Sequence, residues 1–480
     1  MIMLILLTIL FPALGGILVS LWKTGEKTRN YGYTAVIIAT DIIAALALKT
    51  GGRISFLTLS ENIHMLFVPD SLGTFFAIMT LILYTAVCFY SFIYMKMEER
   101  PQVFFAFYFI SLGALLAVCL AGNLVTMYFC FEMLTLTSMP LVLHEMTREA
   151  VNAGMKYLFY SIAGALMGLL AVFFVYFYAK GAAEFTMGGF LDPEKLAGHE
   201  RVMLAVVMTG IFGFGTKAGL YPMHGWLPTA HPIAPAPASA LLSGIIAKAG
   251  VITIIRLVYY SVGADFLRGT WVQYAWMTTA MLTIFMGSMM AYRETVTKKR
   301  LAFSTVSQIS YILLALSCLS PEGLQGALLH VAGHASSKGC LFLCAGVFIY
   351  KLGRRNVEEL RGIGKLMPVT MGCFTVASLS LVGIPPMAGF LSKWVIAQAC
   401  LDNGLGLYSV LPPVILLVSA LLTAGYLLTI VVDAFFPGHG FTDEGEPGSA
   451  EPPLLMTVPM MSLCLVALVV GVFGGEWMLP

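Results

Sequence analysis

Residues 211–256, IFGFGTKAGLYPMHGWLPTAHPIAPAPASALLSGIIAKAGVITIIR, decide how the rest of this chain is organised. The segment places two amines, Lys217 and Lys248, in apolar stretches long enough to cross a bilayer. Irregular backbone at membrane depth must be buried in protein or line a cavity, and an ionisable group there indicates a functional site. Snorkelling to the surface is the alternative, but Lys248 lies near the middle of its apolar segment. Between the two lysines the helix is interrupted by Pro222, Pro228, Pro232, Pro235 and Pro237.

The composition is that of a protein that crosses the bilayer many times. Of the 480 residues, 59% are hydrophobic and 11% are charged, whereas an ordinary soluble domain has about 25% charged residues. Mean hydropathy is +0.88. The net charge of +2 gives no basic excess that would attract nucleic acid. We therefore expect an integral membrane protein whose surroundings are the lipid bilayer, with no nucleic-acid partner.

The apolar segments predict an all-α integral membrane fold. Each crossing takes about twenty apolar residues, which gives about fourteen transmembrane helices. The seventh and twelfth segments are too long for one straight helix, and we expect breaks at Pro222 in the seventh and at Pro385 and Pro386 in the twelfth. The predicted helices lie near residues 3–21, 33–48, 71–95, 103–120, 123–143, 154–178, 202–231, 238–260, 271–292, 301–318, 323–350, 367–400, 407–435 and 454–473.

The loops indicate an orientation and an internal repeat. Lys and Arg gather in loops that follow odd-numbered helices, such as 293–300 and 351–365, which predicts a cytoplasmic (inner) membrane protein with both termini outside. The two breaks lie five helices apart in oppositely directed helices, which is the pattern of an inverted repeat. Residues 437–453, rich in Gly, Pro and acidic residues, predict a flexible loop. The expected domains are 1–100 (helices one to three), 101–262 (first inverted repeat, helices four to eight), 271–435 (second repeat, helices nine to thirteen) and 436–480 (polar loop and helix fourteen).

Ionisable residues recur at depth along the predicted helices. The spacing of His330, His334 and Lys338 is four and four, which puts them on one helical face as a polar stripe. Burial disfavours a charged amine and a nearby carboxylate favours it, so a change in the pairing of Lys217 with Glu132 moves a proton. Histidine passes protons near neutral pH. The series that predicts a proton-translocation path is Glu132, Lys217, Lys248, His330, His334, Lys338 and Lys393.

A metal site is the competing interpretation of the two histidines. Their helix offers no carboxylate or thiolate at ligand spacing except Cys340, which is off that face, so we predict no metal. Cys340 and Cys344 share a helix face, which small-residue packing explains. No dinucleotide-binding, phosphate-binding or iron–sulfur motif occurs, and we predict no cofactor and no electron transfer by this chain itself. Asp70 and Arg256 lie nearer to the ends of predicted transmembrane helices. For these two residues, anchoring at the membrane interface explains the charge at least as well as a functional role does.

Several longer motifs match a known family. KAGLYPMHGWLPTAHPIAPAPASALLSGIIAKAG, residues 217–250, resembles the signature of the antiporter-like subunits shared by respiratory complex I, Mrp cation/proton antiporters (their D-type component) and membrane-bound group 4 hydrogenases. The segments RLAFSTVSQISYILLAL (300–316), HVAGHASSKGCLFLCAG (330–346) and GIPPMAGFLSKW (383–394) resemble the family's later motifs. The resemblance covers roughly the third to the thirteenth predicted helix.

The resemblance implies a fourteen-helix fold with two inverted five-helix repeats. It also implies a proton path through Glu132, Lys217 and Lys248 to an exit group in the twelfth helix, Lys393. Some members have glutamate at that last position, and the lysine is more like the Mrp-type and hydrogenase-type members.

Three functions remain open on the sequence alone. The first is a non-catalytic proton-translocating subunit of a redox-driven pump, of the complex I or group 4 hydrogenase type. The second is a D-like component of an Mrp-type multisubunit antiporter. The third is a stand-alone solute transporter, which would need a solute site that the sequence does not reveal. The first two imply other membrane subunits as partners and protons as the transported ion, with Na⁺ left open.

Overall fold

The computed structural model describes residues 2–60, 63–181, 183–438 and 446–477. Part of the predicted flexible loop 437–453, namely 439–445, lies outside the described residues, as do 478–480 at the end of the predicted domain 436–480. The chain forms two compact units, and each is described separately. The first unit consists of Met1–Cys88, Glu99–Ala218 and Ile246–Val272, and the second of Phe89–Glu98, Gly219–Ile245 and Gln273–Pro480.

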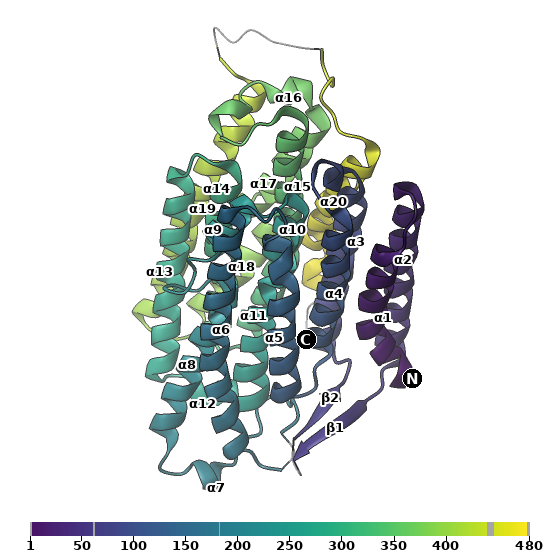
Figure 1. Ribbon diagram of the computed structural model, residues 1–480. Coiled ribbons are helices and arrows are strands. Elements are labelled where there is room, and N and C mark those ends of the chain that lie inside the picture. The colour runs from purple at the N-terminus through teal and green to yellow at the C-terminus, as the bar shows by residue number, and fades with distance from the viewer. Residues whose placement is uncertain (1, 61–62, 182, 439–445, 478–480) are drawn as a thin grey trace. The chain divides into compact units, whose positions relative to one another are not determined.

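The first unit is a helical assembly with a small hairpin (Figure 1). Helix α1 packs along α4, and α6 packs along α8. Its strands are β1 (Ile54–Ser60) and β2 (Ile63–Phe67). Its helices are α1 (Ile2–Leu21), α2 (Glu26–Thr50), α3 (Ser71–Tyr94, whose last turns belong to the second unit), α4 (Pro101–Leu120), α5 (Leu124–Val142), α6 (Arg148–Phe177), α7 (Pro193–Leu196), α8 (Glu200–Ala218), α11 (Lys248–Ile255), the π-helical segment η3 (Arg256–Val262) and α12 (Ala264–Leu267).

Glycines bring α6 and α11 into backbone contact with α8. A Cβ built on Gly164 would lie 2.5 Å from the carbonyl oxygen of Gly213, and one built on Gly213 would lie 2.5 Å from that of Gly164. On the other side, a Cβ at Gly250 would lie 2.5 Å from the carbonyl oxygen of Phe214. Small residues allow this close approach of transmembrane helices. The approach fixes the end of α8, where Lys217 lies.

The hairpin β1–β2 lies between the predicted helices 33–48 and 71–95, where the sequence predicted no regular element. The strands pair antiparallel with Ile54 opposite Phe67, and the hairpin meets the end of α4 through a backbone hydrogen bond from Val68 N to Leu120 O of 2.8 Å. Figure 1 shows it beyond the ends of α4 and α5.

The second unit is organised around one long helix. Helix α15 packs against α10, α14, α17, α18 and α20, and Gly333 of α15 faces Ala388 at the start of α18. The helices of this unit are η1 (Met95–Met97), α9 (Leu227–Ile233), α10 (Ala236–Leu241), η2 (Leu242–Ile246), α13 (Trp271–Arg293), α14 (Thr297–Ser317), α15 (Pro321–Leu352), η4 (Glu358–Leu360), α16 (Ile363–Leu366), α17 (Pro368–Val382), α18 (Ala388–Leu401), α19 (Leu407–Phe435) and α20 (Leu454–Trp477).

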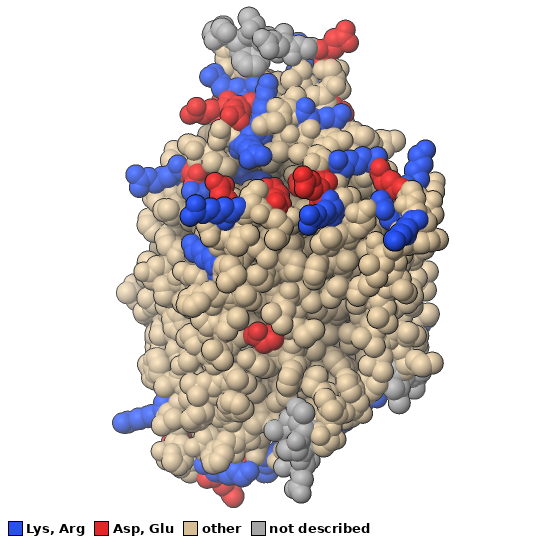
Figure 2. Space-filling view, viewed as in Figure 1, with Lys and Arg blue, Asp and Glu red and all other residues tan. Residues whose placement is uncertain are grey.

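The structure confirms the prediction of a helical, multi-pass membrane protein. Among the described residues, twelve helices are long and apolar enough to cross a membrane, with α17 and α18 as shorter apolar helices. Fourteen were expected. The difference arises because α13 carries several polar side chains along its 23 residues and because the predicted twelfth helix is divided into α17 and α18. On the face drawn in Figure 2, charged side chains gather near helix ends and are sparse midway along the helices.

Candidate functional site

The first group of buried polar side chains lies where α8 meets α5 and α6. Lys217, in the last turn of α8, is 1% exposed. Its Nζ donates a hydrogen bond of 2.6 Å to Thr135 Oγ1. The same Nζ lies over the rings of Phe131 at 4.9 Å and Tyr157 at 5.5 Å. A hydroxyl and two ring faces therefore take the place of water around this amine.

Glu132 is near Lys217 but is not its hydrogen-bond partner. It is half-buried on α5, its Oε1 makes no hydrogen bond to a described residue, and its charge interacts electrostatically with that of Lys217. Glu132 and Thr135 are three residues apart on α5 and share a helical face. The sequence pattern identified Glu132 as a site residue but did not identify Thr135. The three-residue spacing between them was the signal that could have indicated Thr135.

Lys248 lies between two irregular helical segments. It is 0% exposed and begins α11, which follows the π-helical segment η2 and precedes the π-helical segment η3. π-Helical turns are rare and occur frequently at functional sites. The sequence predicted a proline-containing interruption before Lys248. It did not predict that π-helical segments lie on both sides of α11.

A second group lies in the second unit, between α14, α15 and α18. His330 is 2% exposed, its Nδ1 lies 2.9 Å from Ser392 Oγ, and its ring stacks on Tyr311 at 5.3 Å. Lys393 Nζ lies 5.2 Å from the centroid of the Tyr311 ring and donates hydrogen bonds to the carbonyl oxygens of Leu381 (2.5 Å) and Val382 (2.9 Å) at the end of α17. The break between α17 and α18 thus supplies carbonyl acceptors to this lysine.

The predicted stripe on α15 lies inside the protein. His334 is 1% exposed and its ring is 6.1 Å from that of His330. Lys338 is 0% exposed and its Nζ donates a hydrogen bond of 3.0 Å to the carbonyl oxygen of Leu301, which also accepts from Thr305 Oγ1 at 2.9 Å. Within this unit the structure therefore gathers His330, His334, Lys338 and Lys393, whereas Glu132, Lys217 and Lys248 belong to the other unit.

Asp70 and Arg256 do not follow the anchoring interpretation. Arg256, in η3, is 1% exposed and makes two hydrogen bonds to Asp70, of 2.5 and 2.6 Å. Its guanidinium also lies 4.6 Å from the ring centroid of Phe185 and 4.7 Å from that of Tyr260. Two residues 186 positions apart in sequence form this ion pair, so no local pattern could reveal it.

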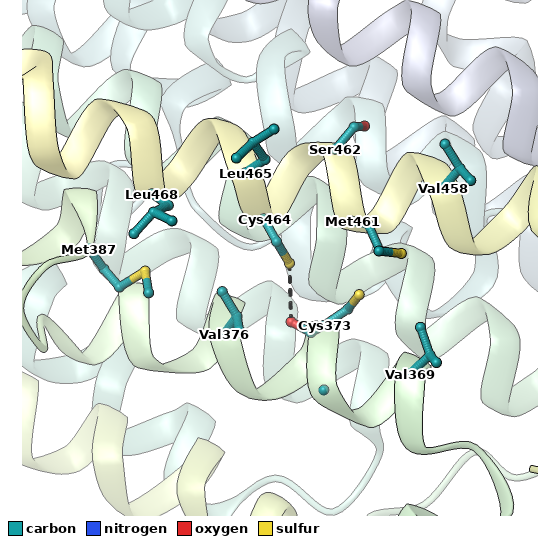
Figure 3. A pocket seen from close by; sticks show the side chains of 11 residues that line it. Val369, Cys373, Val376, Met387, Val458, Met461, Ser462, Cys464, Leu465 and Leu468 are labelled. Atoms are coloured by element: carbon teal, nitrogen blue, oxygen red, sulfur yellow. Dashed lines mark hydrogen bonds between the residues drawn. The ribbon is translucent and has the colours of Figure 1, made fainter.

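Four cysteines come together in the second unit. Cys340 Sγ lies 3.9 Å from Cys344 Sγ and 3.5 Å from Cys464 Sγ, and Cys464 donates to the carbonyl oxygen of Cys373 at 3.5 Å. An open pocket of about 690 Å³ between α17 and α20 adjoins this cluster (Figure 3). No group of three or more His, Cys, Asp or Glu among the described residues is arranged to hold a metal ion. The pocket is lined by Val369, Gly372, Cys373, Val376, Met387, Val458, Met461, Ser462, Cys464, Leu465 and Leu468.

Comparison with known proteins assigns the chain to a family. The family model described as "NADH:quinone oxidoreductase/Mrp antiporter, TM" matches residues 121–431. The chain is 34% identical over 383 residues to NADH-quinone oxidoreductase subunit N of Desulforudis audaxviator, covering 78% of this chain and 74% of that one. It is 30% identical over 436 residues to hydrogenase-4 component B of Escherichia coli, covering 86% of this chain but 62% of that longer protein.

A solved structure has the same fold. A chain in the structure of the Mrp complex from Dietzia sp. DQ12-45-1b superposes with a TM-score of 0.81 at 21% identity, over 100% of this chain and 96% of that one. The family match spans the helices that carry both groups of buried ionisable side chains, from α5 to α19. This protein therefore belongs to the NADH:quinone oxidoreductase/Mrp antiporter transmembrane family.

Proposed function

We propose that the chain is a proton-translocating membrane subunit of a redox-driven ion pump of the complex I or group 4 hydrogenase type. The observation that carries this proposal is the buried amine of Lys217, bound to the Thr135 hydroxyl and influenced by the charge of Glu132. A hydroxyl accepts a hydrogen bond from an ammonium and donates one to a neutral amine. Lys217 therefore keeps a partner whether or not it holds a proton, and the charge on Glu132 biases which state it occupies.

The proposed path continues through Lys248 to the group on α15 and α18. His330, His334 and Lys338 supply further proton-accepting nitrogens, and Lys393 is the exit group. The interruptions after Lys217 and before Lys393, from Gly219 to Trp226 and from Gly383 to Met387, support a fold with two inverted repeats and helix breaks near Pro222, Pro385 and Pro386. We also propose that the chain lies in the cytoplasmic membrane and that both termini are on its outer side.

The second candidate is a D-like component of an Mrp-type cation/proton antiporter. The family to which the chain belongs includes Mrp antiporters by its description, and lysine at position 393 resembles that branch. The two candidates differ in the driving force, which is electron transfer in the first and a cation gradient in the second. In both, other membrane subunits are partners.

Identification of the partners separates the candidates. The complex is purified from its native membrane through a tag on this chain, and the copurifying subunits are identified by mass spectrometry. Subunits with iron–sulfur or nickel–iron motifs support the redox-driven pump. Small hydrophobic subunits without such motifs, together with acidification changes on adding NaCl to everted vesicles without an electron donor, support the antiporter.

The variant Glu132→Gln tests the ion-translocating role itself. We expect the complex to assemble normally and the initial rate of proton translocation, followed with a pH-sensitive dye in proteoliposomes, to fall roughly 100-fold, because a positioned proton-transfer group contributes on this order. The matched control is Glu145→Gln, which alters an exposed carboxylate just beyond α5. Translocation by Glu132→Gln at the rate of the control would show that Glu132 has no part in the path.

A further inference from the structure

A cluster of hydroxyl groups connects three helices of the second unit beside Lys393 and His330. Ser288 of α13, Ser307 of α14 and Ser419 of α19, called here the serine triad, are each 0% exposed. Ser288 Oγ lies 2.7 Å from Ser307 Oγ and 2.5 Å from Ser419 Oγ, and the latter two lie 3.2 Å apart. Ser307 also donates to the carbonyl oxygen of Ile284 at 3.0 Å. Each hydroxyl has one proton, so while Ser307 donates to Ile284 it accepts from Ser288 or Ser419, and the triad is a cluster of hydroxyls that can exchange donor and acceptor roles.

Tyr311 joins the serine triad to the ionisable group. Its hydroxyl lies 3.3 Å from the carbonyl oxygen of Leu416 and interacts with the side chain of Ser419. His330 stacks on its ring and Lys393 lies over its ring, at the distances given above. Lys393 Nζ lies over the ring and not against the hydroxyl, so transfer of a proton between them would need a bridging water or rotation of the lysine side chain.

A second pair of hydroxyls leads toward the charged end of α14. Tyr426 Oη donates to Ser304 Oγ at 2.6 Å, and both side chains are buried. The backbone carbonyl of Tyr426 accepts from Arg300 Nη1 at 2.9 Å, and Arg300 Nε donates to the carbonyl oxygen of Glu294 at 2.8 Å. Glu294 forms an ion pair of 2.7 Å with Lys299, whose side chain is 42% exposed. Arg300 and the two carbonyls have no proton to release. The hydroxyl series therefore ends at Tyr426 and Ser304, and Arg300 and Glu294 mark the direction of the surface.

The spacing of the residues lines them up along one interface. Ser304, Ser307 and Tyr311 are three and four apart on α14, and Ser419 and Tyr426 are seven apart on α19, so each set lies on one helical face. At about 1.5 Å per residue, the segment from Ser304 to Tyr311 spans roughly 10 Å. About one helical turn separates the Ser304–Tyr426 pair from the triad, so a proton that crosses this gap would need a bridging water.

Gln308 supports hydration of this region. It lies on α14 between Ser307 and Tyr311, is 0% exposed, and neither atom of its side-chain amide makes a hydrogen bond to a described residue. Buried polar groups in folded proteins are satisfied by protein or by ordered water. The helix that carries the hydroxyls therefore also carries a buried amide that needs water.

We propose that the serine triad, Tyr311 and the Ser304–Tyr426 pair form a proton-conducting branch that leads from the Lys393–His330 group toward the surface at Glu294, with water carrying the proton past Arg300. This inference rests on the proposed function, proton translocation. Each step moves one proton: an oxygen accepts a proton from its donor side and releases its own to the next oxygen, and rotation of the hydroxyls resets the series. Only O–H and N–H bonds form and break, so no oxidant, reductant or further reactant is needed.

The alternative is that the hydroxyls only hold helices together, a common role of Ser and Thr in membrane proteins. Ser310→Ala is the control for that role. Ser310 lies on the same helix and is equally buried, but its hydroxyl donates to the carbonyl oxygen of Val306 in its own helix. If Ser310→Ala and the triad variants all lower the rate of proton translocation, the hydroxyls act through helix packing. If only the triad variants lower this rate, the triad conducts protons.

The experiment compares three purified, reconstituted complexes with wild type. One carries the double variant Ser307→Ala/Ser419→Ala, the second carries Tyr426→Phe and the third carries Ser310→Ala. We expect the double variant and Tyr426→Phe to assemble and to translocate protons on the order of 100-fold more slowly, with a larger slowing in D₂O than wild type shows. Ser310→Ala should match wild type. If the double variant is unstable, Tyr426→Phe, which removes one oxygen, decides the question.

Two further results separate this inference from the proposed function. Ser419→Thr, which keeps the hydroxyl, should recover much of the rate lost in Ser419→Ala. If the double variant and Tyr426→Phe translocate protons like Ser310→Ala while Glu132→Gln is slow, the branch is wrong and the proposed function stands. If Glu132→Gln is also unaffected, the proposed function itself fails.

Discussion

At the scale of single residues, three lysines of the two groups share one feature: neutral oxygens accept their hydrogen bonds. Lys217 donates to a hydroxyl, and Lys338 and Lys393 donate to backbone carbonyls. Ion pairing with a carboxylate would favour the ammonium strongly and trap its proton. Neutral acceptors bind the ammonium less strongly, which leaves the proton free to move when a nearby charge changes. This property suits a relay better than a structural salt bridge.

The Thr135 hydroxyl should therefore be needed for translocation. In Thr135→Val the side chain keeps its shape but loses the oxygen that accepts from Lys217 Nζ. We expect translocation to fall about tenfold or more and Thr135→Ser to retain most of the rate, since one charged hydrogen bond of about 1.5–3 kcal/mol is lost only in the valine variant. The measurement is the initial rate of dye quenching in proteoliposomes. Equal rates for the valine and serine variants would mean that the hydroxyl plays no part.

Lys393 should require both its charge and its ability to release a proton. Lys393→Met removes the titratable group, and Lys393→Arg keeps a charge that is not released. We expect both variants to block translocation, whereas Lys351→Met, at an exposed position in the last turn of α15, should have no effect. Full activity of either Lys393 variant would remove this residue from the path.

At the scale of elements, glycine contacts decide where the lysine of α8 lies. Helices α6 and α8 approach through Gly164 and Gly213 so closely that neither position has room for a Cβ. Because interiors are close-packed, a displacement of α8 shifts Lys217 away from Thr135 on α5. The packing of helix backbones thus acts directly on the geometry of the proposed relay.

Gly164→Ala tests this link. A Cβ there would meet the backbone oxygen of Gly213 at 2.5 Å, and overpacking of this kind costs about 1–3 kcal/mol. We expect a lower thermal unfolding temperature in detergent and a reduced translocation rate. Gly372→Ala, which has nothing within 4 Å of the added Cβ, is the control and should lower neither quantity, because Ala is also the better helix former.

At the scale of the whole molecule, a relay of lysines, histidines and hydroxyls can only equilibrate protons. Net transport needs a driving force, and the sequence has no dinucleotide, phosphate-binding or iron–sulfur motif that would supply one within this chain. The solved chain with the same fold comes from a structure of a multisubunit complex. We therefore expect this protein to work as one subunit among several.

The isolated chain should accordingly show no oxidoreductase activity. Reconstituted alone in proteoliposomes and supplied with NADH, reduced ferredoxin or hydrogen, with quinone as acceptor, it should leave the donor unoxidised, as followed by absorbance. The complete complex, purified through the same chain, is the positive control if the redox-driven function is right. Donor oxidation by the isolated chain would refute the assignment, and passive proton leakage without oxidation would agree with it.

Amino-acid patterning alone was enough to predict the membrane class, most helices and the buried positions of Lys217, Lys248, His330, His334 and Lys338, because bilayer thickness and helical periodicity are local constraints. The tertiary structure decided which atoms these side chains meet. Thr135 faces Lys217, Asp70 pairs with Arg256 and Ser288 meets Ser419 only because helices far apart in the chain pack together. Hydrogen bonds between such helices depend on ångström-scale packing, which no local pattern of apolar and polar residues encodes.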